Sequence, residues 1–335
     1  MKPPLLKVDN LAVEVSSKAG KVRLIDAVSF EIEAGGAVGI VGESGSGKSI
    51  TSLAIMRLIP DPPLKIAEGR IEYDGINLLD LPLSKMPEIR GRDIAMIFQE
   101  PMSSLNPVMT IGDQIGEALK LHSPGSREQR RARIIELLGL VGIPKPEGRL
   151  DAYPHQFSGG MRQRVMIAMA VACNPKLLIA DEPTTALDVT IQAQVLELMH
   201  KIRKTLNTAV LLISHDLGVI ADVCDRVIVM YAGRVVEDAD VRSVFRAPAH
   251  PYTRALLKSI PRLGGDQTRL FQIPGSVPAA GSVKRGCPFY ARCTLRIDRC
   301  AAEMPPMFSF GAAHRAACWV TSREMSATPT KEVVK

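Results

Sequence analysis

The stretch "AVGIVGESGSGKSITSLAIMRLI", residues 37–59, decides the fold of this chain of 335 residues. A short apolar run ends at the glycine-rich segment 42–49, and an apolar run of helical character follows directly. Glycines let consecutive backbone N–H groups curl around an anion at the positive end of a helix. The pattern G-x-x-x-x-G-K-[ST] between a strand and a helix therefore predicts a phosphate-binding loop.

Each residue type in this loop has a chemical role. Lys48 reaches the β- and γ-phosphate oxygens of a nucleoside triphosphate, and the Ser49 hydroxyl is a ligand for Mg²⁺. From average residue usage, a chance match in a chain of this length is on the order of one in a hundred, so the functional interpretation is favoured. The predicted nucleotide-binding residues of this segment are Gly42, Ser44, Gly45, Ser46, Gly47, Lys48, Ser49 and Ile50.

A second apolar run, residues 177–180, ends at two adjacent carboxylates. Asp181 is placed to hold Mg²⁺ through water, and Glu182 to orient or deprotonate the attacking water. Adjacent acids at a strand end are equally often a solvated loop or a helix cap. The phosphate-binding loop in the same chain favours the catalytic interpretation.

Composition bounds the class of protein. Apolar content of 46% and charged content of 23% are ordinary for a soluble globular chain. No uninterrupted apolar run reaches the roughly 18 residues that span a bilayer, and the start has no continuous apolar signal segment. Six cysteines make no disulfide scaffold, so we expect a cytoplasmic chain. The formal charge of +7 is scattered and alone indicates no partner.

The order of elements indicates an α/β fold with additions. Strand and helix patterns alternate to about residue 240, and the apolar runs are typical of a parallel sheet. Residues 106–156 read as a helical insert, in which Ser126 and Gln129 form a capping box. From about 246 the chain is rich in Gly and Pro around one helix. We expect domains at 1–245, with a helical subdomain at about 106–165, and at 246–335, with a solvated end.

Further motifs follow in a fixed order. After the phosphate loop come "FQEP" with Gln99, "FSGGM" at 157–161, "LLIADEP", "ALD" with Asp188 and "LLISH" with His215. Over about residues 5–240 this order resembles the ATP-binding subunits of ABC transporters. The resemblance implies a RecA-like P-loop core that binds and hydrolyses MgATP.

The resemblance also assigns roles to residues. Glu182 and His215 become catalytic, with His215 against the γ-phosphate. Gln99 touches Mg²⁺, with Ser49 and Asp181, and couples to the membrane partner. The residues that close on the ATP of a second subunit are Ser158, Gly159, Gly160, Met161 and Asp188.

Two positions depart from the family pattern. Met161 stands where the family usually carries Gln, which suggests an unequal pair of ATP sites. No aromatic residue stands where the family stacks the adenine, so Val15 or Val22 offers only apolar contact there.

The tail narrows the resemblance. The segments "APAHPYTRALLKSIP", "IPGSVP" and "GCPFYARC" resemble the C-terminal extension of dipeptide and oligopeptide importer ATPases. This implies a different ATPase chain as partner, two membrane permease subunits, an extracytoplasmic peptide-binding protein, and a peripheral place on the cytoplasmic face of the inner membrane. A sister importer for nickel or another small solute is the alternative. A soluble ABC ATPase acting on nucleic acid is disfavoured, because no basic stripe is interleaved with stacking aromatics.

Four cysteines of the tail, Cys287, Cys293, Cys300 and Cys318, are separated by 5, 6 and 17 residues. Four thiolates are the ligand set of an iron–sulfur cluster. Zinc is the rival, although its ligands usually include pairs two to four residues apart. Free thiols remain a third interpretation, which we give to Cys173 and Cys224. The resemblance tips the balance, because peptide-importer ATPases of this type carry a cluster, most often [4Fe–4S], in this extension.

Overall fold

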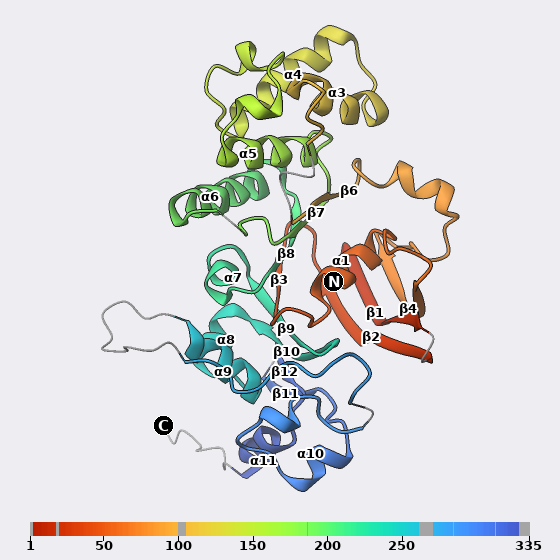
Figure 1. The fold of residues 1–335 in the computed structure, drawn as a ribbon, viewed down its shortest axis with the longest axis vertical. Helices are drawn as coiled ribbons and strands as arrows, with labels where there is room; N and C mark the ends of the chain where they lie inside the picture. The colour runs from red at the N-terminus through yellow and green to blue at the C-terminus, as the bar shows by residue number, and fades with distance from the viewer. Residues whose placement is uncertain are drawn as a thin grey trace, which may run out of the picture.

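The structure is a computed structural model that describes residues 3–17, 20–99, 105–185, 187–260, 271–283, 285–311 and 313–327 (Figure 1). Its strands are β1 (Leu6–Ser17), β2 (Gly20–Ile32), β3 (Ala37–Val41), β4 (Leu64–Tyr73), β5 (Ile76–Asn77), β6 (Ile94–Ile97), β7 (Leu177–Asp181), β8 (Ala209–Ser214), β9 (Arg226–Tyr231), β10 (Arg234–Asp240), β11 (Phe308–Gly311) and β12 (His314–Ala316). Its α-helices are α1 (Lys48–Ile55), α3 (Ile111–His122), α4 (Arg127–Leu140), α5 (Gly159–Ala170), α6 (Val189–Leu206), α7 (Leu217–Val223), α8 (Val241–Arg246), α9 (Pro251–Ser259), α10 (Asp298–Ala302) and α11 (Trp319–Ala327).

The main sheet has the strand order β11-β12-β10-β9-β3-β8-β7-β6. Strands β9, β3, β8, β7 and β6 run parallel to their neighbours, and β3, β7 and β8 are buried at every position. The predicted α/β fold is confirmed, since burial on both faces explains the continuous apolar runs. The carboxyl ends of these parallel strands share one edge of the sheet, so the segments that follow β3, β6, β7 and β8 converge there.

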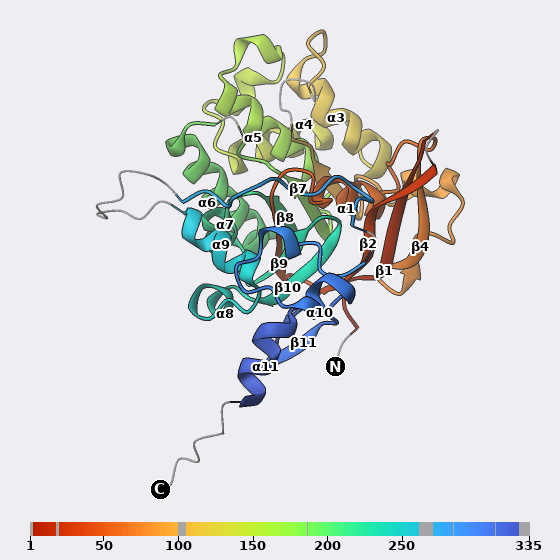
Figure 2. The same ribbon diagram turned by 60° about the horizontal axis from the view of Figure 1, so that its bottom comes forward.

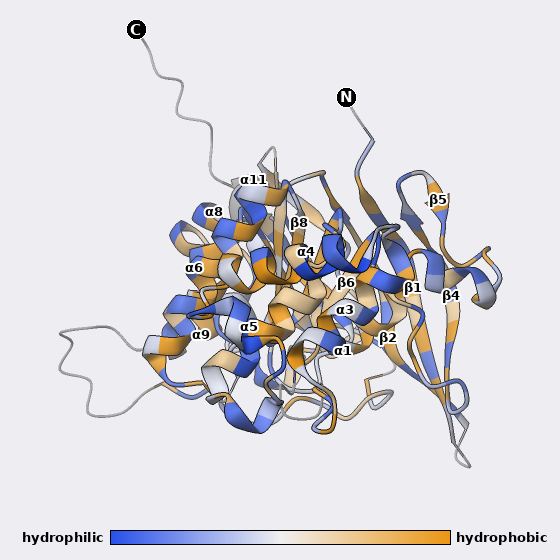
Figure 3. Ribbon diagram, turned by 90° about the horizontal axis from the view of Figure 1, so that it is seen from above, coloured by the Kyte–Doolittle hydropathy of each residue, from blue (hydrophilic) through white to orange (hydrophobic). Residues whose placement is uncertain are grey.

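Two hydrophobic cores lie on opposite faces of this sheet. Alternate residues of β7 separate between them, with Leu177 in one core and Leu178 in the other. The first core lies between the main sheet and an antiparallel sheet of order β2-β1-β4-β5, with α1 beside it. The view in Figure 3 shows apolar residues gathered on the central strands and on the inner sides of the helices.

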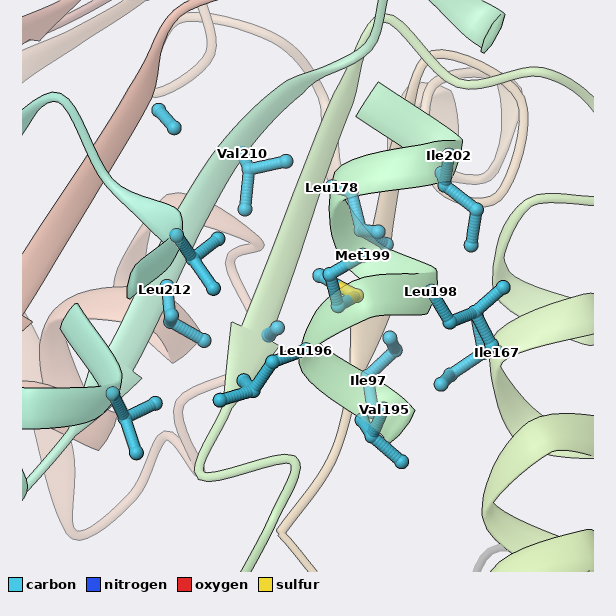
Figure 4. Packing of buried hydrophobic residues seen from close by; sticks show 14 of the residues in the cluster. Ile97, Ile167, Leu178, Val195, Leu196, Leu198, Met199, Ile202, Val210 and Leu212 are labelled. Carbon is cyan, nitrogen blue, oxygen red and sulfur yellow. The ribbon is translucent and has the colours of Figure 1, made fainter. Parts of the chain in front are cut away.

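Helices form the second core. Helices α3, α4 and α5 lie together at one end of the molecule, and α6 and α7 cover the sheet (Figure 1). In Figure 4, Met199 of α6 points toward Leu178 of β7, and Leu198 points toward Ile167 of α5. The predicted capping box at Ser126 is present at the start of α4.

The C-terminal region extends the main sheet, which the sequence patterns did not predict. Strand β12 pairs antiparallel with β10, and β11 pairs with β12 (Figure 2). The buried carboxylate of Glu237 on β10 accepts hydrogen bonds from the backbone N–H groups of Ala249 (2.7 Å) and His250 (2.8 Å), and lies 2.7 Å from Nε2 of His314. Burial raises the pKa of Glu237, but these hydrogen bonds outweigh it and lower the pKa below its ordinary value. The extension is therefore tied to the sheet through one buried anion.

Candidate active site

The loop 42–49 links β3 to α1, as its sequence predicts. Gly45 and Gly47 have φ values of +78° and +101°, which only glycine adopts without strain. A Cβ at Gly42 would lie 2.3 Å from the carbonyl oxygen of Met230. The loop therefore has its glycines where the backbone conformation and close packing require them.

Hydrogen-bond donors of the loop point toward its concave side. Lys48 is buried, and its Nζ donates to the carbonyl oxygens of Gly42 (2.7 Å) and Glu43 (3.1 Å). Burial lowers the pKa of Lys48, and nearby carboxylates such as Glu182 oppose this shift. The buried hydroxyl of Ser46 has no hydrogen-bond partner in the part of the chain that the structure describes. A bound phosphate would give these donors an acceptor.

Oxygen ligands for a divalent cation lie beside the loop. Oγ of Ser49 donates to Oδ1 of Asp181 across 3.1 Å, which joins the start of α1 to the end of β7. Asp181 is buried; this raises its pKa, and the hydrogen bond from Ser49 opposes the shift. Hydroxyl and carboxylate oxygens are ligands that Mg²⁺ accepts, so these residues fit the ion that the sequence predicts.

Glu182 brings the remaining predicted catalytic residues together. Its Oε2 accepts hydrogen bonds from Oγ1 of Thr185 (2.8 Å) and Nε2 of Gln99 (3.3 Å), and lies 3.3 Å from Nδ1 of His215. The φ of Glu182 is +47°, a strained conformation that is concentrated at functional sites. The three segments that follow β6, β7 and β8 thus meet at one carboxylate, which is positioned to accept a proton.

The predicted trans-acting residues lie at exposed helix starts. Ser158 caps α5, and its Oγ accepts from the N–H of Met161 (3.3 Å); Asp188 caps α6 in the same way through Ile191 (2.9 Å). Beside Asp188, Val189 is 84% exposed, an unusual place for a large apolar side chain. The described residues that line the cavity of about 510 Å³ at the phosphate loop are Leu24, Ser44, Gly45, Ser46, Gly47, Lys48, Ser49, Ile50, Gln99, Glu182, Val277, Pro278, Ala279 and Ala280.

Part of this site was not predicted from the sequence. Residues 277–280, which line the cavity, belong to the C-terminal extension. The extension also contacts the loop itself, because the N–H of Glu43 donates to the hydroxyl of Tyr252 (2.8 Å) and its carboxylate pairs with Arg292 (2.6 Å). None of these residues stands in a motif, and contacts across some 200 residues of sequence leave no local pattern.

The four cysteines of the extension lie in one neighbourhood. Burial, with the charges of the Cys300, Cys318 and Cys293 thiolates, raises the pKa of Cys287 to about 12. Burial also raises the pKa of Cys293, and Cys318 and Cys300 add to that shift. All four are free thiols, and within the described residues no group of three ligand side chains is placed to hold a metal ion.

Comparisons with known proteins match both parts of the chain. A family model described as ABC transporter matches residues 25–185, and one described as the oligopeptide/dipeptide transporter C-terminal region matches residues 236–300. The dipeptide transport ATP-binding protein DppD of Escherichia coli is 50% identical over 94% of this chain and 96% of its own. The oligopeptide transport ATP-binding protein OppD of Bacillus subtilis is 48% identical over 99% and 93%. A dimeric structure of the ATP-binding cassette MJ0796 bound to ADP and Pi has a TM-score of 0.63 at 30% identity, covering 71% of this chain and 99% of that one.

Proposed function

This chain belongs to the ATP-binding subunits of ABC transporters, and we propose that it hydrolyses MgATP to drive uptake of dipeptides or oligopeptides through separate membrane subunits. The observation that carries this proposal is the meeting of Gln99, Thr185 and His215 at the Glu182 carboxylate beside an intact phosphate loop. The relatives above are named for peptide transport and match the extension as well as the core. This favours peptides over nickel and over nucleic acid.

The proposed mechanism assigns one task to each group. The loop amides, Lys48 and the start of α1 hold the phosphates, since N–H donors and an ammonium converge there. Ser49, Asp181 and Gln99 hold Mg²⁺, which when bound neutralises phosphate charge. Glu182 takes the proton of the attacking water, and His215 lies on the side where the γ-phosphate is expected.

A second ATPase subunit completes each site in this proposal. Ser158, Gly160 and Asp188 are exposed or half-exposed in a single chain, and Val189 beside them leaves an apolar side chain uncovered. A facing subunit would cover these groups and bring its own phosphate loop to them. We propose that this partner is a different chain, so that Met161 marks one of two unequal sites.

Hydrolysis is accordingly expected to be low in the isolated chain and to rise when the second ATPase and membrane subunits are present. Phosphate release measured on a monomer separated by size, and on the intact complex, tests this. Asp188→Asn in the complex should lower the rate, while Asp222→Asn, on the exposed surface of α7, should not. Full activity in a strictly monomeric preparation would contradict the proposed composite site.

Membrane subunits are the other proposed partners. No helix in the described part of the chain has the length and apolar character to cross a bilayer. Phe98 is 44% exposed directly before Gln99, and Val108 is 79% exposed before α3. These apolar side chains support a docking surface for two permease subunits, which would hold this chain at the cytoplasmic face of the inner membrane. A peptide-binding protein outside the membrane would supply the solute.

We also propose that Cys287, Cys293, Cys300 and Cys318 bind a [4Fe–4S] cluster. Their shared neighbourhood and chemistry suit thiolate ligation of iron. Thiolates around a four-iron cluster stand further apart than thiolates around one ion. Four thiols that affect each other's pKa without forming a single-ion site therefore favour a cluster over zinc. A structural role fits, because no electron acceptor is suggested.

Protein purified without oxygen is expected to be brown and to contain iron and acid-labile sulfide in equal amounts. Cys293→Ser should lose both together, since removing one thiolate opens the ligand set. Cys173→Ser is the matched control, because this thiol lies beside Ser123 far from the extension, and it should retain both. A colourless protein with stoichiometric zinc, or with no metal, would exclude the cluster.

A further inference from the structure

A segment of the extension crosses the nucleotide cavity. We call residues 273–283 the strap; Figure 2 shows it running toward α1 and β2. Its residues Val277, Pro278, Ala279 and Ala280 line the same cavity as the phosphate loop. Further along, Gly281 lies so close to Val22 of β2 that an added Cβ would be 2.7 Å from Cγ1. The strap therefore reaches from the loop to the β1–β2 hairpin.

One buried side chain fixes the strap to the phosphate loop. Arg292 is 5% exposed, and its guanidinium donates to the carbonyl oxygens of Pro274 (2.9 Å) and Ile273 (3.2 Å). The same guanidinium forms a bidentate pair with Glu43 of the loop, at 2.6 and 3.0 Å. Such pairs are geometrically specific. The strap is thus held in register with the groups that bind phosphate.

The cavity needs an apolar surface away from the phosphates. Gln99, Glu182 and Ser49 supply its polar side, and no aromatic ring is among the described residues that line it. The hairpin position Val15 pairs with Val22, so both side chains there are small and aliphatic. A flat nucleobase on this hairpin would have little apolar area on its other face without the strap.

We propose that the strap is the second wall of the base-binding site, with the adenine ring held between Val277 and Pro278 on one side and Val22 and Leu24 on the other. Arg292 is the positioning residue for this wall, and Gly281 lets the backbone approach β2. The inference rests on the proposed ATP site, and it assigns the base end of that site to the extension rather than to the ATPase core alone.

The test separates base binding from phosphate binding by calorimetry on the full chain with ADP and with pyrophosphate, each with Mg²⁺. Val277→Ser removes apolar area from the wall and adds a hydroxyl. It should raise the Kd for ADP by about three- to tenfold and leave that for pyrophosphate within about twofold. Val283→Ser, at a 40% exposed position of the same strap outside the cavity lining, is the matched control and should change neither Kd.

Two results would overturn the inference alone. Wild-type affinity of Val277→Ser for ADP would remove the strap from the base site. Tighter ADP binding by this variant would instead make the strap an obstruction that ADP must displace. Pyrophosphate binding reports whether the variant is folded. A wild-type chain that binds neither ADP nor pyrophosphate would overturn the proposed function, and this inference with it.

Discussion

Replacing Glu182 by Gln is expected to lower ATP turnover by the assembled transporter by about 10²- to 10⁴-fold, the usual cost of losing a positioned base. Gln keeps the size of the side chain and can still contact Thr185 and Gln99, but its amide does not accept the proton of the attacking water. ATP binding should persist, because the phosphates are held by Lys48 and the loop. Phosphate release and nucleotide binding measured on the same preparation test both expectations.

Glu197→Gln is the matched control, since it makes the same chemical change at an exposed position of α6. It should hydrolyse ATP at the wild-type rate. Near wild-type turnover in Glu182→Gln would remove this carboxylate from the mechanism, and the strained φ of +47° would then need another explanation.

Lys48→Ala is expected to weaken nucleotide binding itself. Its ammonium is buried, and a bound triphosphate would replace the carbonyl oxygens of Gly42 and Glu43 as its partner. Truncating one partner of a buried, hydrogen-bonded charge pair costs about 2–5 kcal/mol, so the Kd for ATP should rise at least about 30-fold. Equilibrium binding measured by calorimetry provides the number.

The exposed Lys201→Ala removes an equal charge from α6 and should leave the Kd for ATP unchanged. A wild-type Kd in Lys48→Ala would mean that the loop amides and the start of α1 suffice to hold the phosphates. Loss of turnover without loss of affinity would assign Lys48 to the chemical step alone.

Local patterns predicted the centre of this molecule well. The strands β3 and β7 are continuous apolar runs because both of their faces are covered, and the loop between β3 and α1 is fixed by its own glycines. The capping box at Ser126 is equally local, since its donors and acceptors lie within four residues. In such segments each residue's neighbours in space are also its neighbours in sequence.

The extension was predicted less well for the opposite reason. Strands β11 and β12 have four and three residues and acquire their structure by pairing with β10, more than 70 residues earlier. The pair of Arg292 with Glu43 spans 249 residues, and neither residue is remarkable in its local sequence. The convergence of Gln99, His215 and Glu182 came from the family resemblance. The roles of these residues, the trans-acting set and the domain boundaries at 245 and 246 stay predictions.

Transport by the complete complex tests the central claim most directly. The complex, with its permease subunits and peptide-binding protein, is sealed into vesicles, and movement of a labelled dipeptide is followed with and without MgATP. We predict dipeptide movement that requires MgATP with the wild-type chain and is lost with Glu182→Gln. Dipeptide movement at the same rate without ATP, or with Glu182→Gln in place, would contradict the account.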